Sequence, residues 1–135
     1  MKICVPVSLG GHLTQALTLA KDLKKHEIFF VTSYSGRFRT SNLKWKFYHV
    51  INPARNLLKF VILFVQAFLI IIKEKPDAII STGSNIPIPF FLLGKIMRKR
   101  LVYIESISRV SKPSLSGKML YPLSDMFFVQ WEHLK

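Results

Sequence analysis

The stretch LVYIESISRVSKPSLSGKMLYPLSDMFFVQW, from Leu101 to Trp131, decides the fold class. An apolar, β-rich run, Leu101–Ile104, leads to the acid Glu105, and a second apolar run follows at Met126–Val129. Between them lie a polar connection and a short predicted helix, Leu115–Leu123. Two apolar strands that flank a polar loop and a helix are typical of a parallel α/β sheet, in which such loops gather around a binding crevice.

The rest of the chain repeats this alternation of strands and helices. Further strands are predicted at Lys2–Val7, Glu27–Thr32, Phe47–Ile51 and Asp77–Ser81. Further helices are predicted at His12–Lys25, at Pro87–Met97, and from Asn52-Pro53, with Pro53 at the first helical position, through the run Leu57–Ile72. The fold class that follows is α/β: a Rossmann-like parallel sheet with helices on both faces.

Length, composition and charge limit what the chain can be. Its 135 residues predict a single domain, residues 1–135, and 50% hydrophobic residues are enough to fill one core. A formal charge of +13 points to a polyanionic partner: nucleic acid, anionic lipid headgroups or phosphorylated substrates. Disorder is excluded, because disordered chains combine high charge with low hydrophobicity.

Cysteine usage and the N-terminus indicate the cellular compartment. Cys4 is the single cysteine and lies within an apolar run, so we expect a buried core residue and no internal disulfide. The spacing of potential ligands predicts no metal site, and no cofactor is expected. The apolar run at the N-terminus is too short for a secretory signal, so we expect a protein on the cytoplasmic side.

The run Leu57–Ile72 is unusually apolar, with Lys59 and Gln66 as its interruptions. At ~1.5 Å per residue its 16 positions span about 24 Å, less than the ~30 Å hydrocarbon core of a bilayer. Three interpretations stay open: a buried crossover helix, a helix partly immersed in a membrane interface, and a full span. Basic residues flank the run, and we expect its membrane contacts to include Phe60, Phe64, Phe68 and Leu69.

Three polar loops follow predicted strands, at Ser8–His12, Ser81–Asn85 and Glu105–Arg109. In open α/β sheets, ligands bind at this carboxyl edge. The first two loops contain glycine and lead into helices, whose free N–H groups favour phosphate or carboxylate. Neither loop carries a complete phosphate-binding motif, so a tight turn without a ligand is the alternative for each.

Four side chains near these loops are candidates for chemistry. His12, at a helix start, could contact a phosphate or move a proton near neutral pH, or simply begin the helix. Glu105 needs a partner if buried, and Arg109 is the obvious one; the pair either fixes the loop or contacts a ligand. Lys118 meets a phosphate or is solvated. These residues do not make a complete active site.

The same segments carry a family resemblance. They are SLGGHLTQ (Ser8–Gln15), KEKPDAIISTGS (Lys73–Ser84), VYIESISRV (Val102–Val110), LSGKMLYPLSD (Leu115–Asp125) and FVQW (Phe128–Trp131). Together they resemble the PssD/CpsF type of bacterial polysaccharide-synthesis protein. They also resemble its eukaryotic relative of the ALG-fourteen type, the membrane-anchoring subunit of the two-part UDP-GlcNAc transferase that acts on dolichol-linked glycan precursors.

This resemblance implies the N-terminal half of a GT-B glycosyltransferase such as MurG, expected on the cytoplasmic face of a membrane. It implies a polyprenyl-diphosphate-linked sugar as acceptor. It also implies a small donor-binding partner of the PssE or ALG-thirteen type, without which no activity is expected. Membrane attachment is expected to be peripheral or shallow, through Leu57–Ile72. Relatives continue past the position of Lys135, so a shortened C-terminus is an open alternative.

The resemblance also assigns roles to individual residues. Near the acceptor diphosphate it places Gly10, Gly11 and His12, together with the second glycine loop, Thr82, Gly83 and Ser84. Along the cleft or the partner interface we expect Glu105, Ser106, Arg109, Lys118 and Trp131.

Two other functions compete with a transferase subunit. The charge and the basic, aromatic segment Ser35–Phe47 suit a nucleic-acid binder, but they form no recognised reader motif and leave the hydrophobicity without a purpose. A membrane scaffold without acceptor contact is the other alternative.

Overall fold

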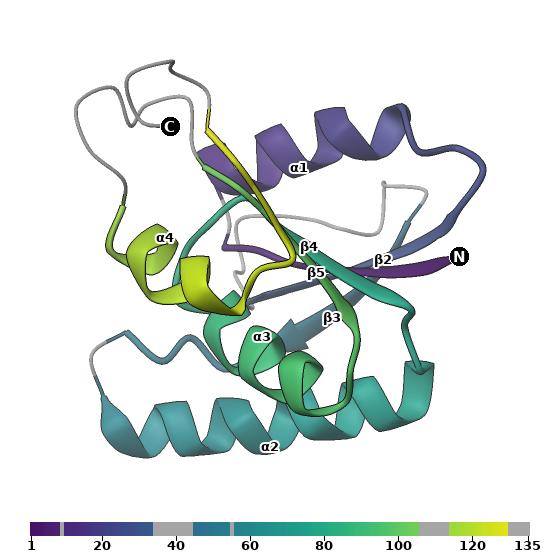
Figure 1. Ribbon diagram of the computed structural model, residues 1–135. Coiled ribbons are helices and arrows are strands. Elements are labelled where there is room, and N and C mark those ends of the chain that lie inside the picture. Colours follow the sequence, from purple (N-terminus) through teal and green to yellow (C-terminus); the bar gives the residue numbers. More distant parts are fainter. Residues whose placement is uncertain (9, 34–44, 55, 106–113, 130–135) are drawn as a thin grey trace.

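The computed structural model describes residues 1–8, 10–33, 45–54, 56–105 and 114–129. Its centre is a parallel sheet of six strands in the order β3-β2-β1-β4-β5-β6, the order of the Rossmann fold (Figure 1). The strands are β1 (Lys2–Pro6), β2 (Glu27–Ser33), β3 (Lys46–Val50), β4 (Ala78–Ser81), β5 (Arg100–Ile104) and β6 (Met126–Phe128). The six predicted strands are confirmed, with each end within one residue of its expected position.

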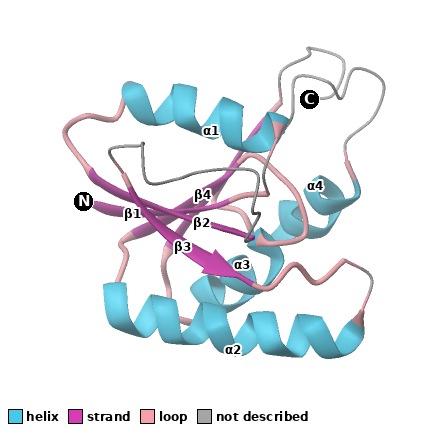
Figure 2. Cartoon of the chain, turned by 180° about the vertical axis from the view of Figure 1, so that it is seen from behind, coloured by secondary structure: helices cyan, strands magenta, loops and turns pink. Residues whose placement is uncertain are grey.

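Two helical layers cover the sheet. The helices are α1 (Gly11–Lys21), α2 (Leu57–Glu74), α3 (Pro87–Ile96) and α4 (Leu115–Leu120), and α4 continues as a 3-10 turn, η1 (Tyr121–Leu123). Figures 1 and 2 show α1 on one side of the sheet and α2 and α3 on the other. Helices on both faces confirm the predicted doubly wound architecture.

Successive strand residues point into two separate cores, as the period of two in a strand requires. On β1, Ile3 and Val5 pack beneath α1, whereas Cys4 points to the side of α2 and α3. Cys4 is fully buried, as expected, and burial raises the pKa of its thiol. The central strands are therefore apolar on both faces, which explains why their sequences show no alternation.

The start of α2 differs from the prediction. The helix begins at Leu57 rather than Pro53, and the Asn56 side chain accepts a hydrogen bond from Lys59 N at 3.1 Å. Upstream, Ala54 adopts φ 47° and donates its N–H to the Asn52 side chain. Asn52 therefore makes a turn, and the left-handed Ala54 cannot belong to a helix. Similarly, α1 ends at Lys21 instead of Lys25.

Candidate functional site

The candidate site lies where β1 and β4 run side by side at the middle of the sheet. From β1 the chain continues to β2 and β3 on one side, and from β4 it continues to β5 and β6 on the other. This reversal is a topological switch point, at which open α/β sheets form a crevice beyond the carboxyl ends of the strands. The two predicted glycine loops follow β1 and β4 and meet there.

The first loop offers an unobstructed helix start. Gly10 has φ 95°, a conformation that favours glycine, and α1 begins at Gly11. Among the described residues no side chain caps this helix, and a Cβ on either glycine would meet none of their atoms within 4 Å. The first turn also lacks an acidic residue, so its N–H groups and positive dipole end can face an anion.

His12 ties the first loop to the second. Its Nδ1 lies 2.9 Å from Thr82 O, and Thr82 Oγ1 donates in return to His12 O at 2.7 Å. A carbonyl can only accept, so Nδ1 carries a proton and donates it to Thr82 O. In the neutral ring Nε2 is then the atom with a free lone pair. The two loops are thus held together with one imidazole nitrogen available for chemistry.

The second loop has a strained backbone. Gly83 has φ 130° and Ser84 has φ 98°, a rare conformation for a residue with a side chain. The loop is anchored by Ser81, whose Oγ donates to Pro6 O at 2.7 Å and accepts from Gly83 N at 3.2 Å. Strain of this kind is concentrated at functional sites, where the surrounding structure holds it in place.

Glu105, at the third loop, is fully buried. Its carboxylate accepts hydrogen bonds from Ser114 N at 2.9 Å and from Ser114 Oγ at 2.9 Å. Ser114 Oγ in turn accepts from Gly117 N, so these two residues together cap the start of α4. A side chain on Gly117 would collide with the Glu105 carboxylate. Glu105 therefore positions α4 against the sheet.

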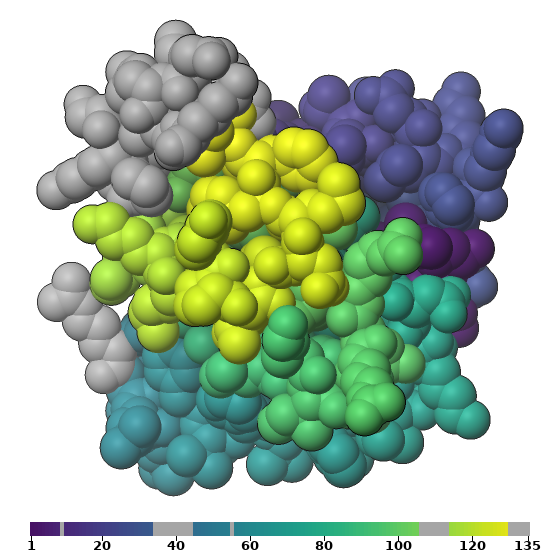
Figure 3. Space-filling model, viewed as in Figure 1, coloured from purple at the N-terminus to yellow at the C-terminus, as the bar shows by residue number. Residues whose placement is uncertain are grey.

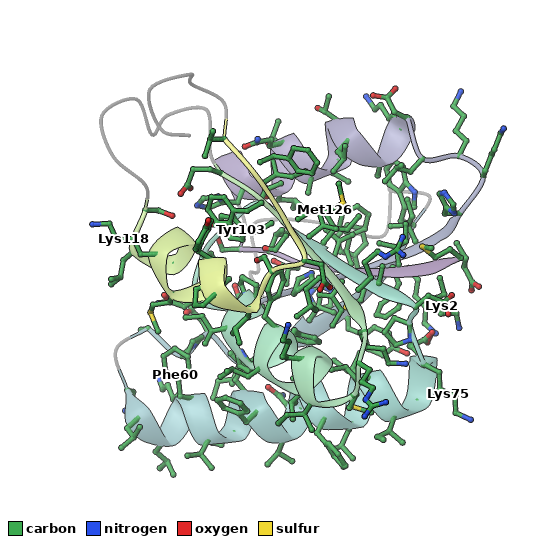
Figure 4. The ribbon with its side chains drawn as sticks, in the orientation of Figure 1. Lys2, Phe60, Lys75, Tyr103, Lys118 and Met126 are labelled. Atoms are coloured by element: carbon green, nitrogen blue, oxygen red, sulfur yellow. The ribbon has the colours of Figure 1, made fainter. Side chains whose placement is uncertain are left out.

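Of the four other predicted cleft residues, the structure describes Lys118 alone. Ser106, Arg109 and Trp131 lie outside the described residues, so the pairing of Glu105 with Arg109 stays a prediction. Lys118 is exposed on α4, and Figure 4 shows its side chain pointing away from the sheet.

Tyr103 is a buried polar side chain that sequence reasoning missed. Its hydroxyl lies 3.2 Å from Ser116 Oγ and 3.3 Å from Ser114 Oγ, in the interior of the molecule (Figure 4). A Cβ on Gly83 would lie 3.2 Å from the same hydroxyl. Tyr103 thus connects the second glycine loop with the start of α4. The sequence feature that could have pointed to Tyr103 is a tyrosine within an apolar strand, because a buried tyrosine hydroxyl normally has a hydrogen-bond partner.

A second feature is the outer face of α2, which runs along the outside of the molecule (Figure 1). Its exposed apolar residues are Leu57, Leu58, Val61, Ile62, Val65, Phe68, Leu69 and Ile72, called here the α2 apolar face. Phe68 and Leu69 belong to it, as expected, whereas Phe60 packs against the core and Phe64 is half-buried. The interpretation of this segment as a fully buried crossover helix is wrong, because one side of α2 packs against the core and the other side is exposed.

Among the helices of the described residues, none has both the length and the apolar character needed to cross a bilayer.

Comparison with known proteins identifies the family. The family model described as "Oligosaccharide biosynthesis protein Alg14 like" matches residues 49–135. The UDP-N-acetylglucosamine transferase subunit ALG14 of Yarrowia lipolytica is 31% identical over 98% of this chain and 74% of its own length. The chain belongs to the Alg14 family.

Other Alg14 relatives match a shorter part of the chain. The human subunit is 43% identical over 51% of this chain, and the Candida albicans subunit is 38% identical over 53%. Each of these matches covers 35% of the relative's length, so the chain spans about a third of the relatives concerned.

Solved structures with little sequence similarity share the fold. MurG from Acinetobacter baumannii superposes with a TM-score of 0.83 at 14% identity, over 100% of this chain and 43% of that protein. UDP-N-acetylglucosamine 2-epimerase from Rickettsia bellii gives a TM-score of 0.78 at 16% identity, over 98% and 39%. The expected Rossmann-like half of a GT-B fold is thereby confirmed.

Proposed function

We propose that the chain is the acceptor-side, membrane-associated subunit of a two-component glycosyltransferase. It adds a sugar from a nucleotide-sugar donor to a polyprenyl-diphosphate-linked acceptor in oligosaccharide or polysaccharide biosynthesis. The meeting of the two glycine loops at the switch point carries the proposal, because it puts an uncapped helix start where a diphosphate would sit. Relatives named as subunits of a UDP-N-acetylglucosamine transferase support the reaction class.

His12 is the residue we assign to proton transfer. With Nδ1 donating to Thr82 O, Nε2 can accept the proton of an acceptor-sugar hydroxyl while that oxygen attacks the anomeric carbon of the donor. The bond from the anomeric carbon to the diphosphate of the donor breaks, and the nucleoside diphosphate leaves. Gly10 and Gly11 leave room for the acceptor diphosphate at the start of α1.

The donor side is supplied by a small partner subunit. A candidate surface for it is formed by exposed apolar residues of α4, η1 and β6: Leu115, Met119, Tyr121, Met126 and Phe128. Among the described strands β6 is the last of the sheet, and its outer edge lies next to these side chains. The start of α4, which belongs to this surface, is fixed by Glu105 near the candidate site. A partner bound to the surface would therefore face the acceptor.

The membrane contact is assigned to the α2 apolar face. Its exposed side chains form a continuous helical stripe, too short to span a bilayer but suited to an interface. Cations at Lys59, Lys73 and Lys75 on the same helix and its cap would reach the level of the headgroups. The exposed apolar face supports peripheral attachment, which we place at the cytoplasmic face, where the candidate site would meet a lipid-borne acceptor.

Reconstitution with the donor-binding partner tests the function. The pair should transfer N-acetylglucosamine from UDP-N-acetylglucosamine to a polyprenyl-diphosphate-linked sugar acceptor in vesicles, while each subunit alone should not. Gly11→Asp should lower the rate at least tenfold, about 1.4 kcal/mol, because it puts a negative charge where the diphosphate binds. Thr18→Asp, which adds the same charge farther along α1, is the matched control and should keep the rate.

His12→Asn separates proton transfer from loop positioning. An asparagine amide can still donate to Thr82 O but has no counterpart of Nε2, so we expect a folded subunit with a rate lowered by about 10²-fold or more. A pair that keeps full activity with both His12→Asn and Gly11→Asp would contradict the acceptor site and favour a membrane scaffold.

A further inference from the structure

A basic depression lies at the opposite edge of the sheet from the glycine loops. It has a volume of about 510 Å³ and is lined by Lys95 and Arg98 at the end of α3, Lys99 and Arg100 at the start of β5, and Asp125 before β6. Because β5 begins here, the depression lies at the amino ends of the strands, whereas the candidate site lies at their carboxyl ends. The two are therefore separate features.

The positive charge of this depression is largely uncompensated. Within the described part of the chain, none of its four cations takes part in an ion pair. Its single carboxylate, Asp125, accepts a hydrogen bond from Leu101 N at 2.7 Å and so joins the start of β5 to the chain before β6. Four like charges around a concave surface repel one another unless an anion is bound, so the depression suits a compact polyanion.

The backbone at Arg98 strengthens this interpretation. Lys99 N donates to Gly94 O at 2.8 Å and Arg98 N donates to Lys95 O at 3.3 Å, the two hydrogen bonds of a Schellman motif. In this motif the left-handed position is usually glycine, but here it is Arg98, with φ 58°. The chain thus carries a guanidinium at a position where glycine would be less strained, and that guanidinium lines the depression.

The depression lies on the same side of the sheet as α2, the helix that carries the α2 apolar face. Helix α3 packs against α2, and the space-filling view shows the green atoms that follow α3 beside the teal atoms of α2 (Figure 3). On α3 itself, Ile96 is 77% exposed directly after Lys95, and Leu92 is also exposed. An apolar surface bordered by cations is the arrangement expected of a protein that rests on an anionic bilayer.

We propose that this depression binds the phosphate of a membrane lipid with an exposed phosphomonoester headgroup, at the rim of the α2 apolar face. The proposal rests on the membrane attachment proposed above and adds a specific lipid class to it. A phosphomonoester carries up to two negative charges and three acceptor oxygens, and arginine side chains can bind it in bidentate fashion. A phosphodiester headgroup at the same position carries a single negative charge, so it neutralises less of the charge of the four cations.

Vesicle binding by the whole 135-residue chain tests the proposal. Wild-type protein should bind phosphatidylcholine vesicles doped with phosphatidic acid more tightly than vesicles of equal surface charge made with phosphatidylserine. Lys95→Gln/Arg98→Gly should remove this preference and weaken binding to the first vesicles by roughly fivefold for each charge lost. Because glycine suits the left-handed position, the Arg98→Gly change should keep the melting temperature at or above its wild-type value, which excludes misfolding as the cause.

Lys24→Gln/Lys25→Gln is the matched control, since it removes two exposed charges from the turn after α1, on the other side of the sheet. If this control weakens binding as much as the test variant, or if wild-type protein binds both charged vesicles equally, the headgroup site is wrong. If glycerol phosphate in solution displaces the protein from vesicles at millimolar concentration, the site binds a soluble phosphate instead of a lipid. Failure of wild type to bind any vesicle would contradict the membrane attachment itself.

Discussion

At Gly83 the backbone passes so close to two side chains that a larger residue would collide with both. A Cβ there would lie 2.7 Å from His12 Cε1 and 3.2 Å from the Tyr103 hydroxyl. The imidazole is itself held by its hydrogen bond to Thr82 O, so it cannot move away without losing one of the two hydrogen bonds between the loops. Gly83 also has φ 130°, which side-chain-bearing residues rarely adopt.

Gly83→Ala should therefore lower the free energy of unfolding by about 2 kcal/mol or more, from backbone strain and from displacement of His12. Urea denaturation followed by fluorescence measures this change. Gly11→Ala is the control, because this glycine lies in a helix and a Cβ there meets no atom of the described residues within 4 Å. It should raise the free energy of unfolding by about 0.5 kcal/mol, and equal effects of the two substitutions would contradict the packing described at Gly83.

The sequence predicts individual site residues only where a local pattern exists. Glycine loops after strands pointed to Gly83 and His12, and the position of Glu105 in an apolar strand predicted that it needs a partner. Its described partner is Ser114, nine residues away, which no spacing rule singles out. Tyr103 was missed because its bonds to Ser114 and Ser116 depend on how α4 packs on β5.

Among the elements, α2 shows how far hydrophobicity alone can be interpreted. The composition of Leu57–Ile72 predicted more apolar surface than one sheet face can cover, and the structure leaves that excess exposed. The composition could not predict where the helix begins, because Asn52 and Asn56 are both plausible N-terminal caps. In the structure Asn56 is the cap, because Asn52 forms a turn and Ala54 is left-handed. Gln66 accepts a hydrogen bond from Ile51 N at 2.9 Å, which joins α2 to the end of β3.

Val65→Glu/Leu69→Glu should weaken membrane binding strongly with little effect on folding. Val65 and Leu69 are 56% and 59% exposed and lie one turn apart on the α2 apolar face. Without these two apolar side chains to insert into the bilayer, the free energy of membrane binding should weaken by about 2 kcal/mol or more, roughly thirtyfold in affinity for anionic vesicles. Liposome flotation measures the effect, and circular dichroism checks that the variant folds.

Thr14→Glu/Thr18→Glu provides the comparison for this experiment. It places the same two charges one turn apart on the exposed side of α1, across the sheet. This protein should float like the wild type apart from a modest charge effect. Equal loss in both double variants would mean that net charge, and not the α2 apolar face, determines attachment.

For the molecule as a whole, periodicity predicts a doubly wound sheet, and that fold class places both glycine loops at the carboxyl edge. The strand order 3-2-1-4-5-6 then makes β1 and β4 neighbours, although about 70 residues separate them, and their loops meet. Contacts between charged residues remote in sequence were not predictable in this way. The clearest example is Glu74, at the end of α2.

Glu74 connects three elements of the fold. Its carboxylate accepts hydrogen bonds from Lys46 Nζ at 2.8 Å and Tyr48 OH at 2.6 Å, both on β3, and from Lys2 Nζ on β1 at 3.4 Å. Figure 4 shows Lys2 near the end of α2 that Lys75 caps. The hydrogen bonds from Lys46 and Tyr48 are the main causes that lower the pKa of Glu74 from 4.5 to about 2.

Because the pKa of Glu74 is lower in the folded chain than in the unfolded one, this network stabilises the fold above pH 4.5. The contribution is lost as pH falls from 4.5 towards 2, when the folded-state carboxylate takes up a proton. Glu74→Gln should lower the free energy of unfolding at pH 7 by about 1 kcal/mol, since solvent screens part of the interaction. Urea denaturation of both proteins across this pH range should show the difference shrinking towards pH 2. Glu27→Gln is the control, because the Glu27 side chain is 73% exposed and its Oε1 lies 3.9 Å from Lys2 Nζ. It should change the free energy of unfolding little at any pH. If the loss of stability in Glu74→Gln stays constant down to pH 2, its cause is packing and not charge.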